Sequence, residues 1–527
     1  MITSSVESHA LDRGRYLALG EILARNARRH PDKTALVFED RSLTFGELNS
    51  RVNRLAHALA RRGVSRGDNV AVLMYNRLEV LESYFACHKL GACPVPVNFR
   101  LAPAEIRYIL DNSDAVGIIV DSTLEGLARE ATKGESGFLL TLNSSPEPGA
   151  EPYEAALLQE QDHEPDVVVT EDDLAFLMYT SGTTGLPKGA MLTHRNLVAN
   201  TINWIMELEA TQDDVWLSGL PLFHIGGVNG ILPFIYTGGT CVITPSTNFD
   251  PADSLAQIAH FQVTMCYFVP TQWQQICTLP GVKDVDTNKL RKALWGASQA
   301  PVSTLELLTS TFPSVGIVNA FGQTEMSSNT CFLKPADAVR KMGSVGKAAV
   351  NVEVRVVDDE MIDVAVGEVG EIVYRGPTVM KGYFRNEAAT EEAFTGGWFH
   401  SGDLVQVDDE GFITVVDRKK DMIISGGENI YPAEVEKVLQ GHPGVSEVAV
   451  VGVAHPKWVE TPVAVVVAVG IPPDEQELIE FAKSRMASYK KPSAVVFIDA
   501  LPRNAAGKVL RRNLRERFGN LFAGDSM

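Results

Sequence analysis

The chain has 527 residues, more than one hydrophobic core accommodates, so at least two domains are expected. Its 66 acidic residues outnumber 47 basic ones, and the resulting formal charge of −19 argues against binding to nucleic acid or anionic membranes. Its apolar stretches are too short to span a bilayer, and its N-terminus lacks a signal-peptide pattern. We therefore expect a cytoplasmic enzyme that acts on small molecules, and the sequence leaves open whether it forms a homo-oligomer.

Six cysteines are scattered through apolar surroundings, without the paired spacing of a zinc site or a redox motif. This distribution predicts reduced thiols in the core. The cysteines are Cys87, Cys93, Cys241, Cys266, Cys277 and Cys331.

Helices and strands alternate in the N-terminal part of the chain. The spacing of Thr44 and Glu47 is that of a capping box, which predicts a helix that ends at Gly63. A helix and strand alternation follows as far as Val120, and this order implies a parallel sheet. The predicted elements are a strand at 69–75, a helix at 78–90 and a strand at 92–97.

A loop rich in glycine and hydroxyl side chains, YTSGTTGLPKG at 179–189, follows the apolar strand predicted at 174–178. Glycine lets successive backbone N–H groups approach an anion, the hydroxyls add donors, and Lys188 adds a positive charge. The pattern predicts a phosphate loop, although its spacing differs from that of the P-loop of nucleotide triphosphatases. The alternative is a flexible surface connection.

Four later clusters each combine glycine with charged residues. In FGQTE, Thr324 can donate to a phosphate and Glu325 can hold magnesium. In SGDL, Asp403 can accept both hydroxyls of a ribose, and Arg418 can add a further contact. Lys508 ends the loop PRNAAGK near the C-terminus. Taken singly, these residues are also explained as a solvated carboxylate, a turn, a linker charge and a surface lysine.

The character of the chain changes near 417–421, where strand-like segments that begin at Glu371 give way to a helix that starts at Pro432. We therefore expect domains at 1–418 and 419–527. In the second domain the pattern predicts strands at 447–453, 463–469 and 494–498 and a helix at 475–486.

The five clusters in this order resemble the motifs of the adenylate-forming superfamily, most of all its acyl-CoA synthetase and fatty-acid–CoA ligase branch. The likeness extends over 43–508. It implies an α/β fold with a large N-terminal AMP-binding domain of parallel and mixed sheets, and a small mobile α+β C-terminal domain with its hinge near Lys420. Small departures occur at His400 and Ser401, where many members have a basic residue and Thr, and at Phe321, where Tyr is common.

The resemblance also implies ATP, Mg²⁺ and CoA as ligands and assigns residues to each. Magnesium is assigned to Thr184 and Glu325, and CoA to Gly426, Gly427 and Trp458. The implied catalytic residues are Lys508, Glu325, Thr324, Lys188 and His224. ATP is assigned to Thr180, Ser181, Gly182, Thr183, Thr184, Gly185, Lys188, Gly296, Ala297, Ser298, Asn319, Ala320, Phe321, Gly322, Thr324, Asp403, Arg418 and Lys508.

In the family's reaction, a carboxylate attacks the α-phosphorus of ATP and forms an acyl-adenylate and pyrophosphate. Lys508 supplies positive charge from the small domain at this step. The small domain then rotates, withdraws Lys508 and presents Gly426 and Gly427, so that a thiol attacks the mixed anhydride. The flat ring of Trp458 matches a position that stacks on the adenine of CoA in some ligases, and a half-buried core tryptophan is the alternative.

The segment around His224 resembles the part of the family that lines the acyl pocket. No acidic residue occurs at 223–231, so a substrate ammonium would lack a partner, which disfavours amino acids. A hydrophobic acid is therefore expected, although its length and ring content cannot be read. Gly226, Gly227 and Gly230 leave room beside His224, and the candidate walls are Val269, Trp273, Trp295 and Met326.

Three functional alternatives remain beside a carboxylate–CoA ligase, which the SGGENIYPAEVE segment favours. One is an acyl-AMP ligase that delivers to a carrier protein or an amine. Another is a luciferase-like oxygenase that oxidises the same adenylate. The third, a nonenzymatic nucleotide-binding relative, is disfavoured by the presence of Lys508 and Glu325.

Overall fold

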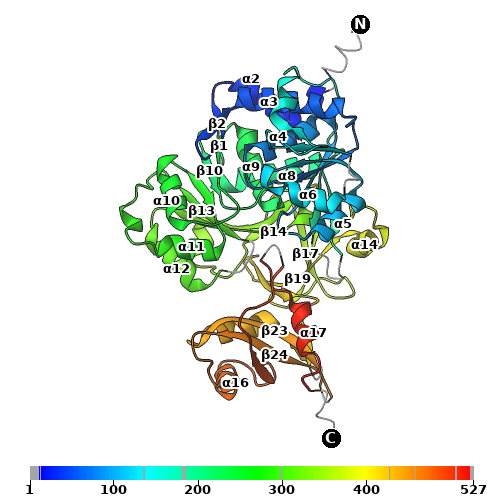
Figure 1. Cartoon of the computed structure of the whole chain (residues 1–527). Helices are drawn as coiled ribbons and strands as arrows, with labels where there is room; N and C mark the ends of the chain where they lie inside the picture. The colour runs from blue at the N-terminus through cyan, green and yellow to red at the C-terminus, as the bar shows by residue number, and fades with distance from the viewer. Residues whose placement is uncertain are drawn as a thin grey trace. The chain divides into compact units, whose positions relative to one another are not determined.

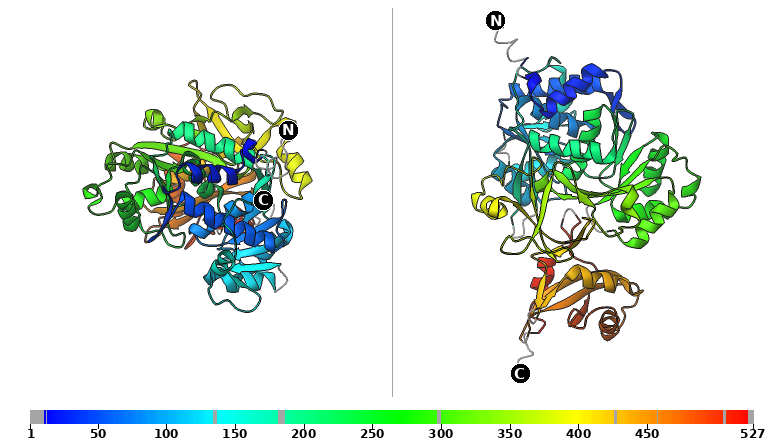
Figure 2. Two further views of the ribbon diagram at one scale, coloured as in Figure 1. Left: turned by 90° about the horizontal axis from the view of Figure 1, so that it is seen from above. Right: turned by 180° about the vertical axis from the view of Figure 1, so that it is seen from behind.

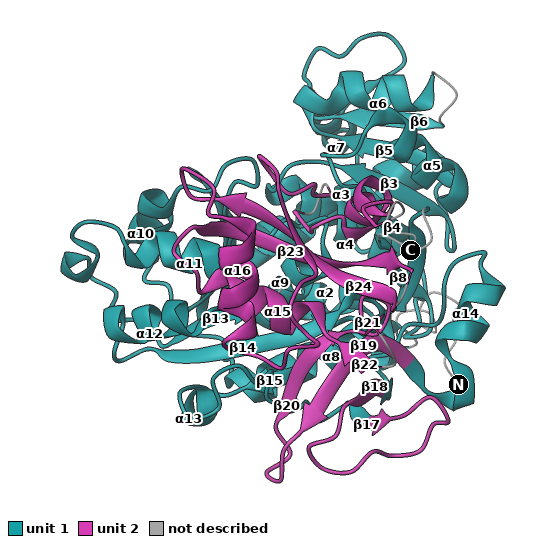
Figure 3. Cartoon of the chain, turned by 90° about the horizontal axis from the view of Figure 1, so that it is seen from below, with its two compact units in different colours: residues 1–354, 374–399 teal, residues 355–373, 400–527 magenta. Residues whose placement is uncertain are grey.

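Two compact units make up the chain in the computed structural model, which describes residues 11, 13–133, 137–180, 186–296, 300–425, 428–456, 458–504 and 507–522. Unit 1 comprises 1–354 and 374–399, and unit 2 comprises 355–373 and 400–527 (Figures 1 and 3). The mixed α/β class expected from the sequence is confirmed. Unit 2 begins before the expected domain boundary at residue 419. It includes residues 355–373 and 400–418, whose strands pair with one another in one sheet.

A nine-stranded sheet forms the core of unit 1, in the order β16-β15-β14-β13-β12-β10-β11-β1-β2. The strands from β14 to β1 run parallel, and β15, β16 and β2 are antiparallel additions at the edges. The parallel strands have apolar residues on both faces because helices cover both. The strands are β1 Thr34–Phe38, β2 Arg41–Thr44, β10 Val215–Ser218, β11 Thr240–Ile243, β12 Met265–Tyr267, β13 Lys292–Gly296, β14 Gly316–Gln323, β15 Ser328–Leu333 and β16 Lys347–Ala348.

The helices that connect these strands lie on opposite faces of the sheet. The step from β10 to β11 runs toward one edge, whereas the steps from β11 through β12 and β13 to β14 run toward the other. Because parallel crossovers are right-handed, α9 covers one face and α10, α11 and α12 cover the other (Figures 1 and 2). The connecting helices are α9 Ile225–Thr237, α10 Pro251–His260, α11 Pro270–Cys277 and α12 Val302–Thr311. Further helices of unit 1 are α2 Leu19–Arg29, α8 His194–Leu208, α13 Pro335–Ala338 and α14 Glu387–Ala393.

A second, parallel sheet in unit 1 has the order β4-β3-β5-β6-β7, as the helix and strand alternation predicted. The predicted capping box is present: Glu47 N donates to Thr44 Oγ1 (3.1 Å), and Thr44 N donates to Glu47 (2.8 Å). The elements are α3 Phe45–Arg61, β3 Asn69–Leu73, α4 Leu78–Leu90, β4 Cys93–Pro96, α5 Pro103–Ser113, β5 Ala115–Val120, α6 Glu125–Thr132, β6 Phe138–Thr141, β7 Glu151–Pro152 and α7 Tyr153–Leu158.

Unit 2 contains two sheets, of which the first has the order β17-β18-β19-β20. The second has the order β22-β21-β24-β23, with β25 parallel to β24. One of its apolar faces packs with α15 and α16, and the other packs with α17. The elements are β17 Glu353–Val357, β18 Gly370–Arg375, β19 Phe399–Val407, β20 Ile413–Arg418, β21 Ile423–Ser425, β22 Glu428–Ile430, α15 Pro432–Gln440, β23 Val445–His455, β24 Val459–Ala468, α16 Glu475–Lys483, β25 Ala494–Phe497 and α17 Arg511–Phe518.

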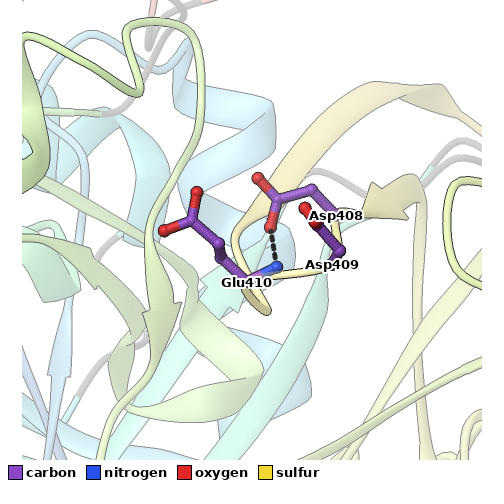
Figure 4. A group of neighbouring side chains, drawn as sticks. All are labelled: Asp408, Asp409 and Glu410. Carbon is purple, nitrogen blue, oxygen red and sulfur yellow. Dashed lines mark hydrogen bonds between the residues drawn. The ribbon is translucent and has the colours of Figure 1, made fainter.

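Asp408, Asp409 and Glu410 gather their carboxylates in the turn between β19 and β20 (Figure 4). Asp408 Oδ1 accepts hydrogen bonds from the backbone N–H groups of Glu410 (3.0 Å) and Phe412 (2.8 Å). The cluster is therefore explained by the turn that Asp408 closes. Within the described ranges, no helix combines the length and apolar character needed to cross a membrane.

Two histidines are fully buried in unit 1, with ring centroids 5.1 Å apart. His88 Nε2 lies 2.8 Å from Ala175 O, and His194 Nδ1 accepts from Leu19 N at 3.3 Å. Loss of hydration lowers the pKa of His88 well below its usual range and that of His194 to about 3. Both rings are therefore neutral at pH 7. All six cysteines are free and buried, as expected.

We predict that the free energy of unfolding decreases as pH falls from about 7 to about 5. A histidine in the unfolded chain binds a proton near pH 6.5, whereas the buried ring stays neutral. Each buried histidine contributes up to about 1.4 kcal/mol per pH unit to this slope. In His194→Asn an amide oxygen still accepts from Leu19 N but does not titrate, so urea unfolding at the two pH values should show a shallower slope. His260→Asn, at an exposed position in α10, is the control, and an unchanged slope in His194→Asn would contradict the prediction.

Candidate active site

After the carboxyl ends of the neighbouring strands β10 and β12, the chain continues toward opposite faces of the nine-stranded sheet. These strands are neighbours, with Ser218 opposite Tyr267, but β10 continues to α9 and β12 continues to α11. Ligands of open α/β sheets bind at such a switch point, where the connections diverge and leave a crevice. His224 and Gly296 lie at the same edge of the sheet.

His224 precedes α9 and caps its first turn. Its Nδ1 accepts a hydrogen bond from Gly226 N at 3.1 Å. A neutral ring that accepts at Nδ1 carries its proton on Nε2, so the exposed imidazole presents an N–H donor. A Cβ atom at Gly227 would lie 2.2 Å from Pro221 O, so glycine is required for the turn that positions His224.

Tyr267, which the sequence analysis did not single out, lies on the same face of the sheet as α9. Trp216 of β10 stacks on Phe234 of α9, with ring centroids 5.1 Å apart, and Tyr267 is two residues beyond Met265, the register partner of Trp216. The phenol ring is 5% exposed, and its hydroxyl makes no hydrogen bond with the described residues. A Cβ atom at Gly296 would lie 2.3 Å from this hydroxyl. Only glycine therefore fits beside the Tyr267 hydroxyl.

The four predicted pocket walls differ in their placement. Trp273 is fully buried, and its indole N–H donates to Leu294 O at 2.8 Å. Trp295 is 2% exposed and, by alternation along β13, points away from the α9 face that Gly296 shares. Both tryptophans are thus buried, and their role as pocket walls stays a prediction. Val269 is partly exposed, and Met326 is fully buried beside Asn200, whose amide donates to Met326 O at 3.2 Å.

The predicted phosphate loop connects two strands of an antiparallel hairpin, β8 Leu174–Thr180 and β9 Lys188–Thr193. Thr180 lies directly opposite Lys188 in this hairpin, so the last residue before the loop and the cation after it are neighbours. The pairing thus places Lys188 beside Thr180, where the hydroxyl-rich stretch begins. The candidates Ser181, Gly182, Thr183, Thr184 and Gly185 lie outside the described residues, as do Ala297 and Ser298.

The FGQTE cluster spans the end of β14 and the short 3-10 helix η3 Thr324–Met326. Asn319, Ala320 and Phe321 occupy the carboxyl end of β14, paired with β15. A Cβ atom at Gly322 would lie 1.9 Å from Ser328 O, so the close approach of these two strands requires glycine. Gly322 therefore helps to fix the position at which β14 ends and η3, with Thr324 and Glu325, begins.

Glu325 is held by its backbone and by its side chain. Met380 N donates to Glu325 O at 2.7 Å, and Ser327 and Ser328, two and three positions later, adopt left-handed φ angles of +60° and +102°. The carboxylate Oε1 lies 3.3 Å from Thr180 Oγ1 and accepts from Tyr383 OH at 3.0 Å. Left-handed backbone at non-glycine residues costs free energy that the surrounding contacts offset, a feature common at functional sites.

Asp403 and Arg418 are partners in unit 2, directly opposite each other on β19 and β20. Asp403 Oδ1 lies 2.6 Å from Arg418 Nε, and Asp403 is 3% exposed. Lys508 belongs to the same unit, in a loop where its N–H donates to Asn504 Oδ1 at 2.9 Å. Partial loss of hydration, followed by repulsion from Arg418 and Lys420, lowers the pKa of Lys508. Three predicted ATP-site residues thus influence one another within unit 2.

The candidate CoA-binding residues lie near the start of the second sheet of unit 2. Trp458 precedes β24 and is 42% exposed, so it is not a core side chain. Its exposure leaves the flat ring accessible to a ligand. Gly426 and Gly427 lie outside the described residues.

Comparison with known proteins shows to which family the chain belongs. Residues 23–384 match the model of the AMP-binding enzyme family, and residues 434–508 match that of the AMP-binding enzyme C-terminal domain. A feruloyl-CoA synthase from Amycolatopsis is 42% identical over 506 residues, with 95% of this chain and 99% of the relative covered. An indoleacetate–CoA ligase from Aromatoleum aromaticum is 38% identical, with 95% and 98% covered.

Among solved structures, an o-succinylbenzoate coenzyme A synthetase from Bacillus subtilis is similar over nearly the whole chain. Its complex with ATP and magnesium ion has a TM-score of 0.83 and 35% sequence identity, and the match covers 94% of this chain and 99% of that one. Its complex with an acyl-adenylate intermediate has a TM-score of 0.84. Structures of this fold therefore hold both ATP with magnesium and the adenylate that follows.

The fold and the site define an enzyme that activates a carboxylic acid with a nucleotide. The chain belongs to the AMP-binding enzyme family, whose model matches more than half of its length. It is an acid–thiol ligase: it uses ATP and Mg²⁺ to convert a carboxylic acid to an acyl-adenylate, then transfers the acyl group to CoA, with AMP and pyrophosphate as products.

Proposed function

We propose that the protein is an aryl-CoA ligase, which activates an aromatic carboxylic acid through its adenylate and transfers the acyl group to CoA. Two relatives that align with almost the whole chain, feruloyl-CoA synthase and indoleacetate–CoA ligase, are named for acids that carry an aromatic ring. The observation that carries the proposal is Tyr267. Its hydroxyl lacks a partner among the described residues and lies at the switch point on the α9 face, where it would meet the ring of the acid.

The acid's two ends would meet different surroundings in this pocket. The N–H of His224 Nε2 would approach the carboxylate oxygen or the adenylate carbonyl, because Nδ1 is already occupied by Gly226 N. The ring would extend along the α9 face toward Tyr267, with Gly226, Gly227, Val269 and Met326 around it. Tyr267 would limit the depth of the pocket and donate to a polar substituent on the ring.

In the adenylation step, the proposed roles of the unit 1 residues follow from their charges. Lys188 would neutralise phosphate charge next to the loop at 180–185, and Thr324 would donate to the α-phosphate. Glu325, with Thr184, would hold the magnesium ion: its Oε2 makes no hydrogen bond with the described residues and is available as a hard oxygen ligand. The bound ion would neutralise charge on the phosphates. Gly296, Ala297, Ser298 and residues 319–322 would line the adenine.

The proposed roles in unit 2 concern the ribose, the late cation and CoA. Asp403 would accept from the ribose hydroxyls while Arg418 balances its charge, and Lys508 would stabilise the adenylate oxygens. A rotation about a hinge near Lys420, between domains at 1–418 and 419–527, would then bring Gly426, Gly427 and Trp458 to CoA. A cytoplasmic location, without nucleic-acid partners, completes the proposal.

The substrate class is tested with a panel of aromatic and aliphatic acids, ATP and Mg²⁺, in which AMP formation is measured with and without CoA. We expect aromatic acids such as a hydroxycinnamate to give the highest kcat/KM, and AMP formation to depend on CoA. Turnover of long aliphatic acids with greater kcat/KM would refute the aryl assignment. AMP formation that is equally fast without a thiol would point to an acyl-AMP ligase instead.

Tyr267→Phe tests the proposed contact with the ring substituent. A neutral hydrogen bond contributes about 0.5–1.5 kcal/mol, so kcat/KM for a ring-hydroxylated acid should fall about two- to tenfold. The unsubstituted acid of the same skeleton is the control, and its kcat/KM should stay unchanged because the phenylalanine ring preserves the packing. Equal losses for both acids would remove Tyr267 from substrate recognition.

Lys508→Ala is predicted to impair adenylation far more than thioester formation. Loss of one charge-stabilising donor costs on the order of a hundredfold or more, so pyrophosphate exchange should fall by about that factor, while preformed acyl-adenylate still reacts with CoA. Because the pKa of Lys508 is lowered, the wild-type adenylation rate should decline at a pH below the ordinary lysine value of about 10.4, and Lys508→Arg should flatten this decline. Lys437→Ala, an exposed lysine of α15, is the control. Equal losses in both half-reactions would exclude the proposed division of roles.

A further inference from the structure

Tyr383 contacts two residues of the proposed site in unit 1: Glu325, assigned to magnesium, and Lys188, assigned to ATP. Its hydroxyl donates to Glu325 Oε1 at 3.0 Å, and Lys188 Nζ lies 5.0 Å from the centroid of its ring. The ring is therefore close enough for a cation–π interaction with the Lys188 ammonium. One side chain thus contacts both the carboxylate and the cation of the site.

The backbone around Tyr383 is fixed to the strand that begins with Lys188. Tyr383 forms an antiparallel bridge with Ala190 of β9, and Phe384 N donates to Gly189 O at 2.8 Å. Tyr383 N in turn donates to Thr390 Oγ1 of α14 at 3.0 Å. The ring consequently has a defined position relative to the phosphate hairpin.

The hydrogen bonds to Glu325 occupy only one of its carboxylate oxygens. Both Tyr383 OH and Thr180 Oγ1 approach Oε1, and Oε2 makes no hydrogen bond with the described residues. Both donors are uncharged hydroxyl groups, so neither would offset the negative charge of a carboxylate. Asp403 differs, because Arg418 lies 2.6 Å from its carboxylate and balances its charge. An anionic carboxylate held at one oxygen by neutral donors is suited to offer the other oxygen to a cation.

We infer that Tyr383 is a positioning residue for adenylation: its hydroxyl holds Glu325 with Oε2 free for magnesium, and its ring holds the Lys188 ammonium beside the phosphate loop. The inference rests on the proposed magnesium role of Glu325 and is independent of which acid is the substrate. A purely structural role, in which Tyr383 only ties residues 380–384 to β9, would affect stability without changing the dependence on metal.

Tyr383→Phe removes the hydrogen bond and preserves the ring. Hydrogen bonds to charged groups contribute about 1.5–3 kcal/mol, so the magnesium concentration that gives half-maximal pyrophosphate exchange should rise on the order of tenfold. The affinity for Mn²⁺ in the presence of ATP, measured by electron paramagnetic resonance, should fall by a similar factor. ATP binding in EDTA should not change, because Lys188 still has its aromatic partner.

Tyr383→Leu also removes the ring. Its metal-free ATP affinity should therefore fall a further two- to fivefold, since an exposed cation–π pair contributes about 0.5–1 kcal/mol. The two variants separate the hydroxyl's effect on the metal from the ring's effect on Lys188. Equal ATP affinities of the Phe and Leu variants in EDTA would overturn the role of the ring.

Tyr153→Phe is the matched control, because the Tyr153 hydroxyl also donates to a glutamate in unit 1, Glu82 Oε2, at 2.7 Å. It should lower stability but leave the magnesium requirement unchanged, and a rise equal to that of Tyr383→Phe would overturn the inference. Glu325→Gln distinguishes the two levels of the argument. If Glu325→Gln raises the magnesium requirement and Tyr383→Phe does not, positioning by Tyr383 is wrong while the role of Glu325 stands. If Glu325→Gln has no effect, both roles are wrong.

Discussion

The departure of the chain toward opposite faces after β10 and β12 is the constraint on which the active site depends. Adjacent parallel strands cannot cover the gap between them at their carboxyl ends when their helices diverge. His224 begins the helix on one face, and Tyr267 ends the neighbouring strand with its side chain directed to that same face. The position of this crevice in unit 1 is therefore a property of strand order.

The second requirement is electrostatic, because two anions must approach each other in a protein with a net charge of −19. In the proposed site, positive side chains next to the phosphates would supply the needed charge, although the protein as a whole is acidic. Lys188 begins the second strand of the hairpin, after the proposed phosphate loop, and Glu325 accepts hydrogen bonds from uncharged hydroxyl groups. Asp403 is paired with Arg418 instead, which suits a group that accepts hydrogen bonds from an uncharged sugar. The same residue type, a carboxylate, thus acquires different chemistry from its neighbours.

Several elements were predictable because their signals are local. The capping box of Thr44 and Glu47, the alternating helices and strands before Val120 and the strands of the second sheet of unit 2 agree with the structure. Residues 355–373 belong to unit 2 because they pair with strands that come later in the sequence, and no local signal indicates that pairing. Trp273 and Trp295 were expected as pocket walls because they are large and apolar, but their size does not indicate how deeply the tertiary structure buries them.

The sequence by itself determined the family, the order of the nucleotide motifs and the absence of an acid in the acyl segment, because these are properties of neighbouring residues. Only the tertiary structure decided that Tyr383, 58 positions after Glu325, donates to that carboxylate, and that the Tyr267 hydroxyl lies against Gly296. No local sequence pattern used above indicates the role of either tyrosine. Their positions follow from strand register and from a bridge between distant segments, which are fixed by the whole sheet and not by local sequence.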